Sequence, residues 1–424
     1  MKRLKFIKLP SITFLDTWKN KIKERTAADR KKADIKMQSD EMLSLTEKLK
    51  LHRIREHIKV ILIVTAVLIT VTALVVYNRI HVRNGYQVIS SVERTDDAAT
   101  SYVRLKNCIL KCNPNGVTCV NGSNEVQWNV TFTMQSPIVD VCGSTVVVGD
   151  QRGNTVYVFD KNGEIGHFEV EHTLTKVRVS NQGVVAAVLE DGEVTWVNVY
   201  DSQGTLLVKN KTSMNITGYP VDIDLSSDGR KLMVSYLGMD NNDVVSKVAF
   251  YNFSTIGQSE TDYLVNQAEY SGMVVPEVCF LDRNYAVAFR DNGMIFFSGR
   301  QVPEEGEEVL VEQEIISAFH NEKYVGIVTP SDEKEQKHKY KLQIFRCDGS
   351  RCGVKYFDME YTDISVLGEE ILMHNTTEIE VYGISGRKKA SIEYEKPIID
   401  IMRVGGQRKY DVFTTESTDR IKIK

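Results

Sequence analysis

The densest run of oxygen-bearing side chains lies just before Gly229. Asp222, Asp224, Ser226 and Asp228 alternate along the chain, as oxygen ligands do at the start of a calcium-binding loop. An EF-hand loop beginning at Asp224 would require a bidentate Glu at its twelfth position, and Ser235 stands there instead. The Ser-x-Asp-Gly order therefore predicts a tight turn between two strands.

A second set of carboxylates recurs at similar places along the chain. Asp150, Asp191, Asp240 and Asp291 each follow a largely apolar segment and come just before or within a turn. We expect the loops 150–154, 191–193, 239–243 and 291–293 to gather on one face, where they form candidate binding loops. The alternative is that these carboxylates converge on a central channel and perform hydrolase- or lyase-like chemistry.

Other catalytic patterns are missing from the sequence. There is no GxSxG nucleophile motif and no Walker-type or dinucleotide glycine loop. His167, His172 and His320 have no Ser or Cys nearby in a nucleophile setting, and we expect them to be structural or solvated. The sequence predicts no cofactor and no metal, and favours a protein that is not an enzyme.

All seven cysteines follow residue 100, which suits an oxidising compartment. Cys347 and Cys352 flank an Asp-Gly turn, so they could form a disulfide across a hairpin, or they could be small buried residues. Cys108, Cys112, Cys119 and Cys142 could supply one more bridge. No CxxC pair or Cys/His cluster has the spacing of a zinc site.

An apolar segment divides the chain into two unlike parts. It begins with Val60, Ile61 and Leu62, ends at Tyr77, and contains no charged residue. As a helix its eighteen residues would be about 27 Å long, which is enough to cross a bilayer. We predict a transmembrane helix over 59–78. A cleaved signal peptide fits less well, because the basic segment ahead of it is too long.

Charge predicts the orientation of this helix. Residues 1–59 contain 17 Lys and Arg against 8 Asp and Glu, and the remainder contains 36 against 49. Basic segments stay in the cytoplasm, so residues 1–58 should form a cytoplasmic, partly helical arm at the cell membrane. The part beyond the membrane is acidic and lacks a basic stripe, which argues against nucleic-acid binding.

Beyond residue 85 the chain is a degenerate repeat of short strands. A strand, a polar turn and a nearly all-apolar strand precede an aromatic strand such as TVYVFDKNGE (155–164) or VNVYDSQGT (197–205). Units begin near residues 102, 137, 175, 220, 275, 315, 362 and 397. Four-stranded repeats of about 40–45 residues are the signature of a β-propeller.

The ends of the repeat region predict how the ring closes. The last unit is one strand short, whereas YQVISSV (86–92) has strand character and no unit of its own. Pairing the two would close an all-β propeller of eight blades, or of seven if 102–130 is a partial blade. Residues 79–101 are then a linker with the closing strand, and 102–424 the extracytoplasmic propeller. The charged segments 304–314 and 331–341 are expected to be exposed loops.

The repeat strands also carry a resemblance. IDLSSDGRKLMVSY (223–236) is similar to a turn of WD40-like and TolB-type repeats, and VYVFDKNGEIGHFEV (156–170) looks like a strand pair of quinoprotein-type (PQQ-like) propellers. The whole layout resembles a family of uncharacterised single-pass membrane proteins from Gram-positive Firmicutes, which implies a fold and a location but no activity. No unit ends in a Trp-Asp pair, and no quinone site is present.

Taken together, the sequence predicts a membrane-anchored extracytoplasmic β-propeller that acts as a protein-binding scaffold of the cell envelope. The alternatives are a propeller enzyme with carboxylates at the central channel, and a transmembrane sensor.

Overall fold

A computed structural model describes residues 31–32 and 45–424, apart from 98, 107, 215–216, 242, 332–336 and 407. The chain forms two compact units, residues 1–81 and residues 82–424. Most of the predicted cytoplasmic arm, residues 1–30 and 33–44, lies outside the described residues. So do 332–336 of the predicted loop 331–341.

The described part of the first unit is dominated by one long helix, α2 (Leu45–Ile80). The predicted membrane segment is helical throughout, and the helix continues without a break into the segment before it. Its large apolar side chains from Val60 to Val71 are exposed. The stretch Leu49–Ala73 is long and apolar enough to cross a membrane.

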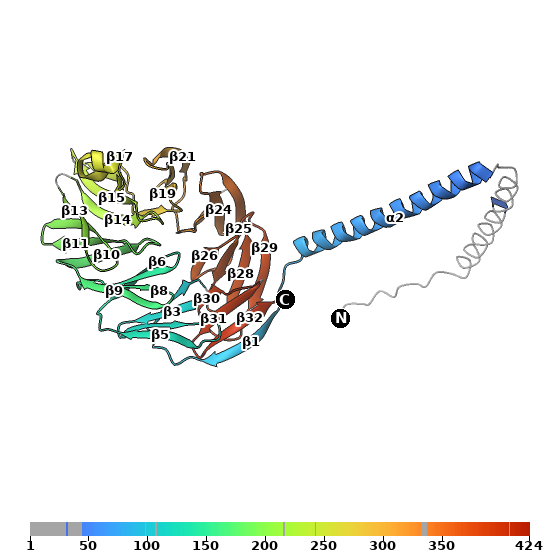
Figure 1. Ribbon diagram of the computed structural model, residues 1–424, viewed down its shortest axis with the longest axis horizontal. Coiled ribbons are helices and arrows are strands. Elements are labelled where there is room, and N and C mark those ends of the chain that lie inside the picture. The colour runs from blue at the N-terminus through green and yellow to red at the C-terminus, as the bar shows by residue number, and fades with distance from the viewer. Residues whose placement is uncertain are drawn as a thin grey trace, which may run out of the picture. The chain divides into compact units, whose positions relative to one another are not determined.

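The second unit consists of four-stranded antiparallel sheets, the blades (Figure 1). Blade 1 contains β2 (Ser101–Leu105), β3 (Cys108–Asn113), β4 (Gly116–Val120) and β5 (Val126–Thr131). Blade 2 contains β6 (Pro137–Cys142), β7 (Thr145–Asp150), β8 (Thr155–Asp160) and β9 (Gly163–Glu169). Blade 3 contains β10 (Thr173–Val179), β11 (Val185–Asp191), β12 (Val194–Tyr200) and β13 (Leu206–Ser213). Blade 4 contains β14 (Tyr219–Leu225), β15 (Lys231–Asp240), β16 (Asp243–Asn252) and β17 (Leu264–Ser271), with two short 3-10 turns, Gly257–Ser259 and Thr261–Tyr263.

The remaining blades follow the same plan. Blade 5 contains β18 (Glu277–Phe280), β19 (Tyr285–Arg290), β20 (Gly293–Ser298) and β21 (Glu304–Leu310). Blade 6 contains β22 (Ser317–His320), β23 (Tyr324–Pro330), β24 (Tyr340–Arg346) and β25 (Arg351–Phe357). Blade 7 contains β26 (Asp363–Leu367), β27 (Glu370–His374), β28 (Glu378–Gly383) and β29 (Lys388–Glu393). Blade 8 contains β30 (Ile398–Arg403), β31 (Lys409–Thr414), β32 (Ser417–Ile423) and, from the other end of the domain, β1 (Tyr86–Glu93).

Eight blades are therefore confirmed, and each begins within two residues of its predicted start. The predicted closing strand pairs antiparallel with β32, with Tyr86 opposite Ile423 and Glu93 opposite Ser417. This pairing hides the edge of β32 and ties the two ends of the domain into one ring. The segment 304–310, expected to be a loop, is instead the outer strand β21. An outer blade strand faces solvent, so charged residues are tolerated there.

The core is divided among the blade interfaces. Each of eight apolar clusters is built from two neighbouring blades. The second and third strands of each blade are the most buried, which explains nearly continuous apolar sequences such as that of β7. The smallest cluster lies between blades 8 and 1, where the buried residues are Tyr102, Ile109, Val120 and Phe413. That seam depends more than the others on polar contacts.

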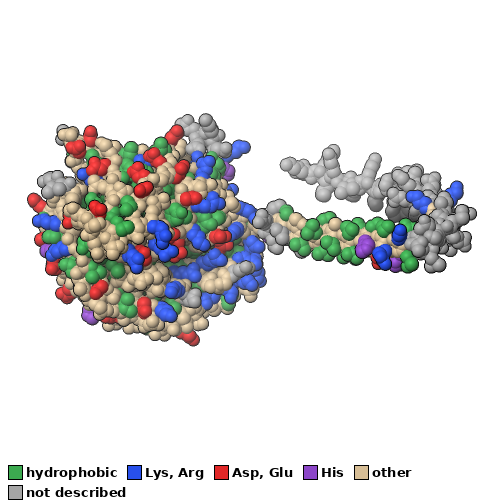
Figure 2. Space-filling view, turned by 45° about the horizontal axis from the view of Figure 1, so that its top comes forward, with side chains coloured by type: hydrophobic (Ala, Val, Ile, Leu, Met, Phe, Trp, Pro, Cys, Tyr) green, Lys and Arg blue, Asp and Glu red, His purple; other side chains and the backbone are tan. Residues whose placement is uncertain are grey.

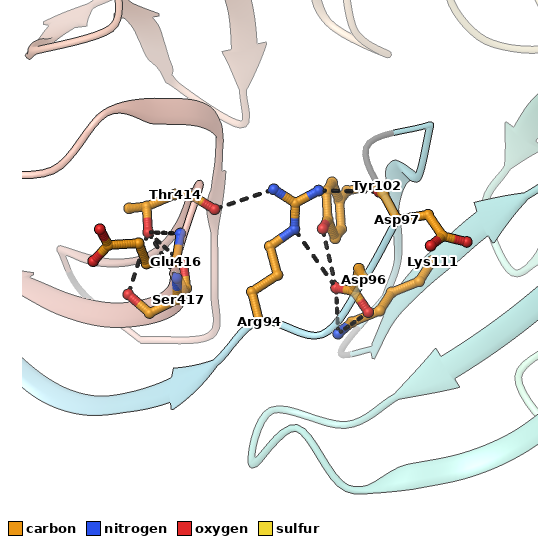
Figure 3. Close-up of polar contacts among 8 residues, drawn as sticks. All are labelled: Arg94, Asp96, Asp97, Tyr102, Lys111, Thr414, Glu416 and Ser417. Carbon is orange, nitrogen blue, oxygen red and sulfur yellow. Dashed lines mark hydrogen bonds and ion pairs between the residues drawn. The ribbon is translucent and has the colours of Figure 1, made fainter.

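A polar clamp holds one end of the seam (Figure 3). Arg94 follows β1 and donates hydrogen bonds to the carbonyl oxygens of Thr414 (3.2 Å) and Asp97 (3.3 Å). Its guanidinium lies 5.5 Å from the ring centroid of Tyr102. Asp96 accepts from the Tyr102 hydroxyl (3.0 Å) and from Lys111 Nζ (2.8 Å). The clamp thus joins blade 8 to blade 1 where apolar packing is thinnest.

The direction of the strands defines two faces of the ring. In every blade the first-to-second and third-to-fourth connections lie on one face, and the chain enters the ring there through residues 82–85. We call this the entry face. The second-to-third connections and the links between blades lie on the opposite face, the far face. First strands of neighbouring blades contact one another (β6 with β10, β10 with β14, β14 with β18, β22 with β26), so they surround the centre.

Candidate functional site

A cluster of charged side chains lies on the inner strands of blades 2 to 4. Arg178 on β10 is at its centre. Its Nη2 lies 3.4 Å from Oδ1 of Asp222, and Asp140 and Asp224 each approach a guanidinium nitrogen at 4.0 Å. Arg178 Nε also donates to the carbonyl oxygen of Ile223 (3.1 Å). One guanidinium therefore serves three carboxyl groups from two neighbouring strands, β6 and β14. We call Asp140, Arg178, Asp222 and Asp224 the central cluster.

The carboxyl groups of the cluster also tie each blade to the next. Asp140 accepts a hydrogen bond from the backbone N–H of Val179 (2.7 Å). Asp222 accepts from the N–H of Val278 (3.0 Å), and Asp224 from that of Phe280 (2.6 Å). Inner strands of different blades do not pair in a common sheet, so their facing N–H groups need other acceptors. The central cluster supplies them and joins blades 2, 3, 4 and 5.

The position of the cluster alters its ionisation. Burial raises the pKa of Asp224 to about 8, with Asp140 adding to the rise and Arg178 opposing it. Burial also raises the pKa of Asp140 and of Glu277 on β18. His320, at the end of β22, is reachable by solvent in the channel, yet the surrounding protein and then the Arg178 charge lower its pKa to about 4.

A cavity of about 400 Å³ lies over the cluster and opens between first-to-second strand turns, hence towards the entry face. Its lining includes Asp140, Arg178, Asp224, Glu277 and His320. With a carboxyl group whose pKa is near 8, it could exchange a proton with a bound molecule or hold a small polar group. The same contacts serve a structural purpose, because every carboxyl of the central cluster accepts a backbone bond from the next blade.

The four aspartates predicted from the sequence lie elsewhere. Asp150, Asp191 and Asp240 end the second strands of blades 2, 3 and 4, and Asp291 follows that of blade 5, so all four belong to the far face. Asp150 is buried and accepts from the N–H groups of Gln135 and Ser136, both at 2.9 Å. The other three are exposed. Within the described part of the chain no hydrogen bond or ion pair joins any two of them, and their binding role stays a prediction.

The suggested bridge between Cys347 and Cys352 is not formed, because both thiols are free. Cys347 packs against the cluster between blades 5 and 6, whereas Cys352 packs against the one between blades 6 and 7. The two side chains therefore point to opposite faces of blade 6. Cys108, Cys112, Cys119 and Cys142 are free as well.

Sequence reasoning missed Arg178 and Asp140 as partners and placed Asp222 and Asp224 next to a turn. They lie on β14, and only Ser226–Gly229 forms the predicted turn, with Gly229 at φ 68° and the Ser226 hydroxyl bonded to Asp228 (2.8 Å). His320 ends β22 and lines the cavity. A signal was present, because Asp222 and Asp224 alternate with apolar residues on a first strand, which places both carboxylates on the same side of that strand.

The fold defines an eight-bladed β-propeller preceded by a helix that could span a membrane. Residues 79–423 match the model of a family of unknown function, DUF5711, and the chain belongs to that family. No curated protein shows significant similarity to the sequence.

Solved structures share the fold at low identity. A eukaryotic initiation factor structure is similar at a TM-score of 0.51 and 10% identity, over 80% of this chain and 88% of that one. BamB from Moraxella catarrhalis is similar at a TM-score of 0.47 and 12% identity, over 80% and 100% of the respective chains. Hydrazine synthase from Kuenenia stuttgartiensis gives 0.42 and 12%, over 65% and 92%. At these identities the likeness with the initiation factor shows the fold alone.

Proposed function

We propose that this protein is a single-pass membrane protein whose extracytoplasmic propeller binds a protein partner of the cell envelope. The observation that carries the proposal is a set of large apolar side chains exposed on the far face of a rigid ring. They are Met214, Met239, Val244, Leu310 and Ile316, contributed by blades 3 to 5 and by the link to blade 6.

These side chains are unusually exposed. Met239 is 71% exposed and Leu310 is 67% exposed. Met239 stands near the tip of the β15–β16 hairpin, whose strands have ten residues each and are the longest of the propeller. Apolar side chains that protrude from a rigid scaffold are typical of protein-binding surfaces, since their burial against a partner is favourable. Met adapts its shape to a partner easily.

The anchoring part of the proposal rests on α2. Its apolar side chains have no protein to cover them, and lipid would remove them from water at roughly 25 cal/mol per Å². The basic residues before the helix favour a cytoplasmic N-terminus, which would place the propeller outside. Exposure of residues 82–424, but not of 1–44, to protease added to intact cells would support this orientation.

Site-specific photo-crosslinking in intact cells tests the binding role. A photoreactive residue at position 239 or 310 should capture a defined envelope protein, whereas the same residue at 161 or 283 on the entry face should not. Met239→Asp together with Leu310→Asp should reduce capture from position 214 at least tenfold while thermal stability stays unchanged. Equal capture from both faces, or none from an abundant folded protein, would refute the proposal.

A catalytic role for the central cavity is the second candidate. The observation that favours it is Asp224, a carboxyl group with a pKa near 8 beside an arginine in a 400 Å³ cavity. Screening the purified chain for hydrolytic activity, with Asp224→Asn as the control, tests it. Activity that does not change in that variant would count against the cavity.

A further inference from the structure

A basic patch lies on the entry face where blades 7, 8 and 1 meet. It consists of Arg83, Arg104, Lys106, Arg387, Arg403, Arg408 and Lys409, all from connections or strand ends on that face. Figure 2 shows Lys and Arg side chains gathering over one region of the propeller surface. The patch contrasts with the acidic balance of the chain beyond residue 59, so its charge is local.

Two neighbouring cavities open in the patch, and both are lined by Arg403. The larger, of about 450 Å³, lies at the seam between blades 8 and 1, and its basic lining residues are Arg104, Lys106, Arg403, Lys409 and Arg420. The smaller, of about 280 Å³, is lined by Arg83, Lys389, Arg403 and Arg408, with Glu370 as its acidic residue. Each cavity is large enough to admit an anionic group of phosphate size. The guanidinium groups can bind such a group, because they donate two parallel hydrogen bonds to a pair of phosphate oxygens.

Few carboxylates neutralise these cations. Glu370 lies 3.3 Å from Arg403, but it also pairs with Lys389 (3.0 Å) and accepts from the Tyr410 hydroxyl (3.0 Å). Among the described residues, no carboxylate lies within 4.0 Å of a side-chain nitrogen of the other six patch members.

The cations of the patch also repel one another. The pKa of Arg83 is lowered by burial and then by the charges of Arg408 and Arg387. Burial, followed by the charge of Arg403, lowers that of Arg104. A bound anion would relieve the repulsion.

The rest of the entry face differs from the patch. There several exposed cations stand next to acids in the sequence: Lys161 follows Asp160, Arg283 follows Asp282 and Lys323 follows Glu322. The charges of blades 2 to 6 on this face are therefore mixed.

The short connection between α2 and the propeller indicates which source of anions the patch can reach. The backbone of Arg83 is fixed to blade 7, since its N–H donates to Lys389 O (3.1 Å) and its carbonyl accepts from Ser391 N–H (2.9 Å). Helix α2 ends at Ile80, and three residues of chain span at most about 11 Å. A surface in which the end of α2 is anchored is thus within reach of Arg83.

We propose that the basic patch binds the phosphate headgroups of anionic lipids in the membrane that anchors α2, so that the propeller docks with its entry face against the bilayer. This inference rests on the proposed membrane anchoring. Docking would leave the far face, with its apolar side chains, turned away from the membrane and open to a partner. Basic residues near an anionic membrane surface attract it additively, and salt weakens the attraction.

The test uses the full chain reconstituted in lipid nanodiscs, with amide hydrogen exchange as the readout. Three conditions are compared: phosphatidylcholine alone, phosphatidylcholine with 30% phosphatidylglycerol, and phosphatidylcholine with 10 mM inorganic phosphate. Phosphatidylglycerol should slow exchange in peptides covering 82–89 and 399–410 at least threefold. The effect should disappear in 0.5 M NaCl, and peptides of the far face should not change.

Two matched variants distinguish an effect of the charges in the patch from an effect of the net charge of the propeller. The patch variant carries Arg83→Gln, Arg104→Gln, Arg408→Gln and Lys409→Gln. The control variant removes four exposed charges from other blades on the same face: Lys161→Gln, Arg283→Gln, Arg300→Gln and Lys323→Gln. Protection by phosphatidylglycerol should be lost in the first variant and kept in the second.

Each outcome decides the inference. If inorganic phosphate slows exchange and phosphatidylglycerol does not, the inference is overturned in favour of a free anion as the ligand. If both variants lose the protection by phosphatidylglycerol equally, the inference is overturned, because net charge and not the patch then explains the effect. A chain that enters nanodiscs but shows no protection overturns the inference alone. A chain that does not enter nanodiscs overturns the proposed anchoring.

Discussion

Replacing Arg178 by Met should loosen the centre of the ring. The substitution removes the charge and keeps an unbranched side chain, so that it tests electrostatics more than packing. It leaves Asp140 and Asp224 beside each other without their shared cation. Asp222 keeps Lys176, whose Nζ lies 2.8 Å from Oδ1.

The size of the effect follows from the distances. A pair of unit charges 4 Å apart is worth about 4 kcal/mol at an effective dielectric constant of 20. Asp224, with a pKa near 8, carries little charge at pH 7, so mainly Asp222 and Asp140 contribute. The Arg178 side chain is 31% exposed, and its own desolvation cost is recovered on removal. We therefore expect a net loss of about 2–3 kcal/mol in the free energy of unfolding.

Urea denaturation of the full chain in detergent micelles measures this loss, because urea does not screen charge. The fluorescence of Trp128 and Trp196 in the propeller reports unfolding. Arg283→Met is the control, since Arg283 is exposed and makes no ion pair with a described residue, and it should change stability by less than about 0.5 kcal/mol. The loss in Arg178→Met should be smaller at pH 5 than at pH 8, because Asp224, with a pKa of about 8, is protonated at pH 5 and about half ionised at pH 8. A loss below 0.5 kcal/mol, or one equal at pH 5 and pH 8, would refute the reasoning.

Three further predictions concern the cavity, the seam and the helix. The pKa of Asp224 is raised to about 8, so its contribution to stability is complete below about pH 4 and is lost as pH rises through 8. Asp224→Asn should therefore flatten the fall in the free energy of unfolding between pH 5 and pH 8, by at most about 4 kcal/mol; an unchanged slope would contradict this. Arg94→Gln removes the seam clamp and should cost roughly 1–2 kcal/mol. Hydrogen exchange should then accelerate in β1 and β32 more than in β14, and uniform acceleration would argue against a local role. Val64→Arg with Leu68→Arg should reduce membrane retention of the chain on fractionation, at about 3 kcal/mol per arginine, whereas full retention would speak against a bilayer-spanning helix.

The two faces of the propeller suggest a division of labour. The entry face carries the chain connection and the basic patch, while the far face carries Met239, Leu310 and the longest hairpin. If both proposals hold, lipid binding would orient the ring and leave one face available to a partner. Crosslinking from position 239 in nanodiscs with and without phosphatidylglycerol would connect the two.

Much of the fold was legible in the sequence because its information is local. Apolar second strands, polar turns and aromatic third strands repeat with the period of a blade, and each unit must bury its faces against its neighbours. The turn glycines are also local signals. Gly204 and Gly386 have φ of 82° and 78°, positive values that tight hairpin turns require and that glycine adopts readily. The eight blade starts, the closing strand 86–92 and the apolar helix could therefore be predicted from the order of residues alone.

The polar sites could not be predicted, because they depend on which blades become neighbours and how their strands are staggered. Arg178 meets Asp140 and Asp222 across 38 and 44 positions of sequence, and nothing in the local pattern pairs them. The basic patch unites Arg83 with Arg387 and Arg408 only because β1 closes the ring beside the last blade. The repeat, the ring and the helix follow from local residue patterns, whereas the packing of the blades sets which charges share a cavity and which face of the ring each side chain occupies.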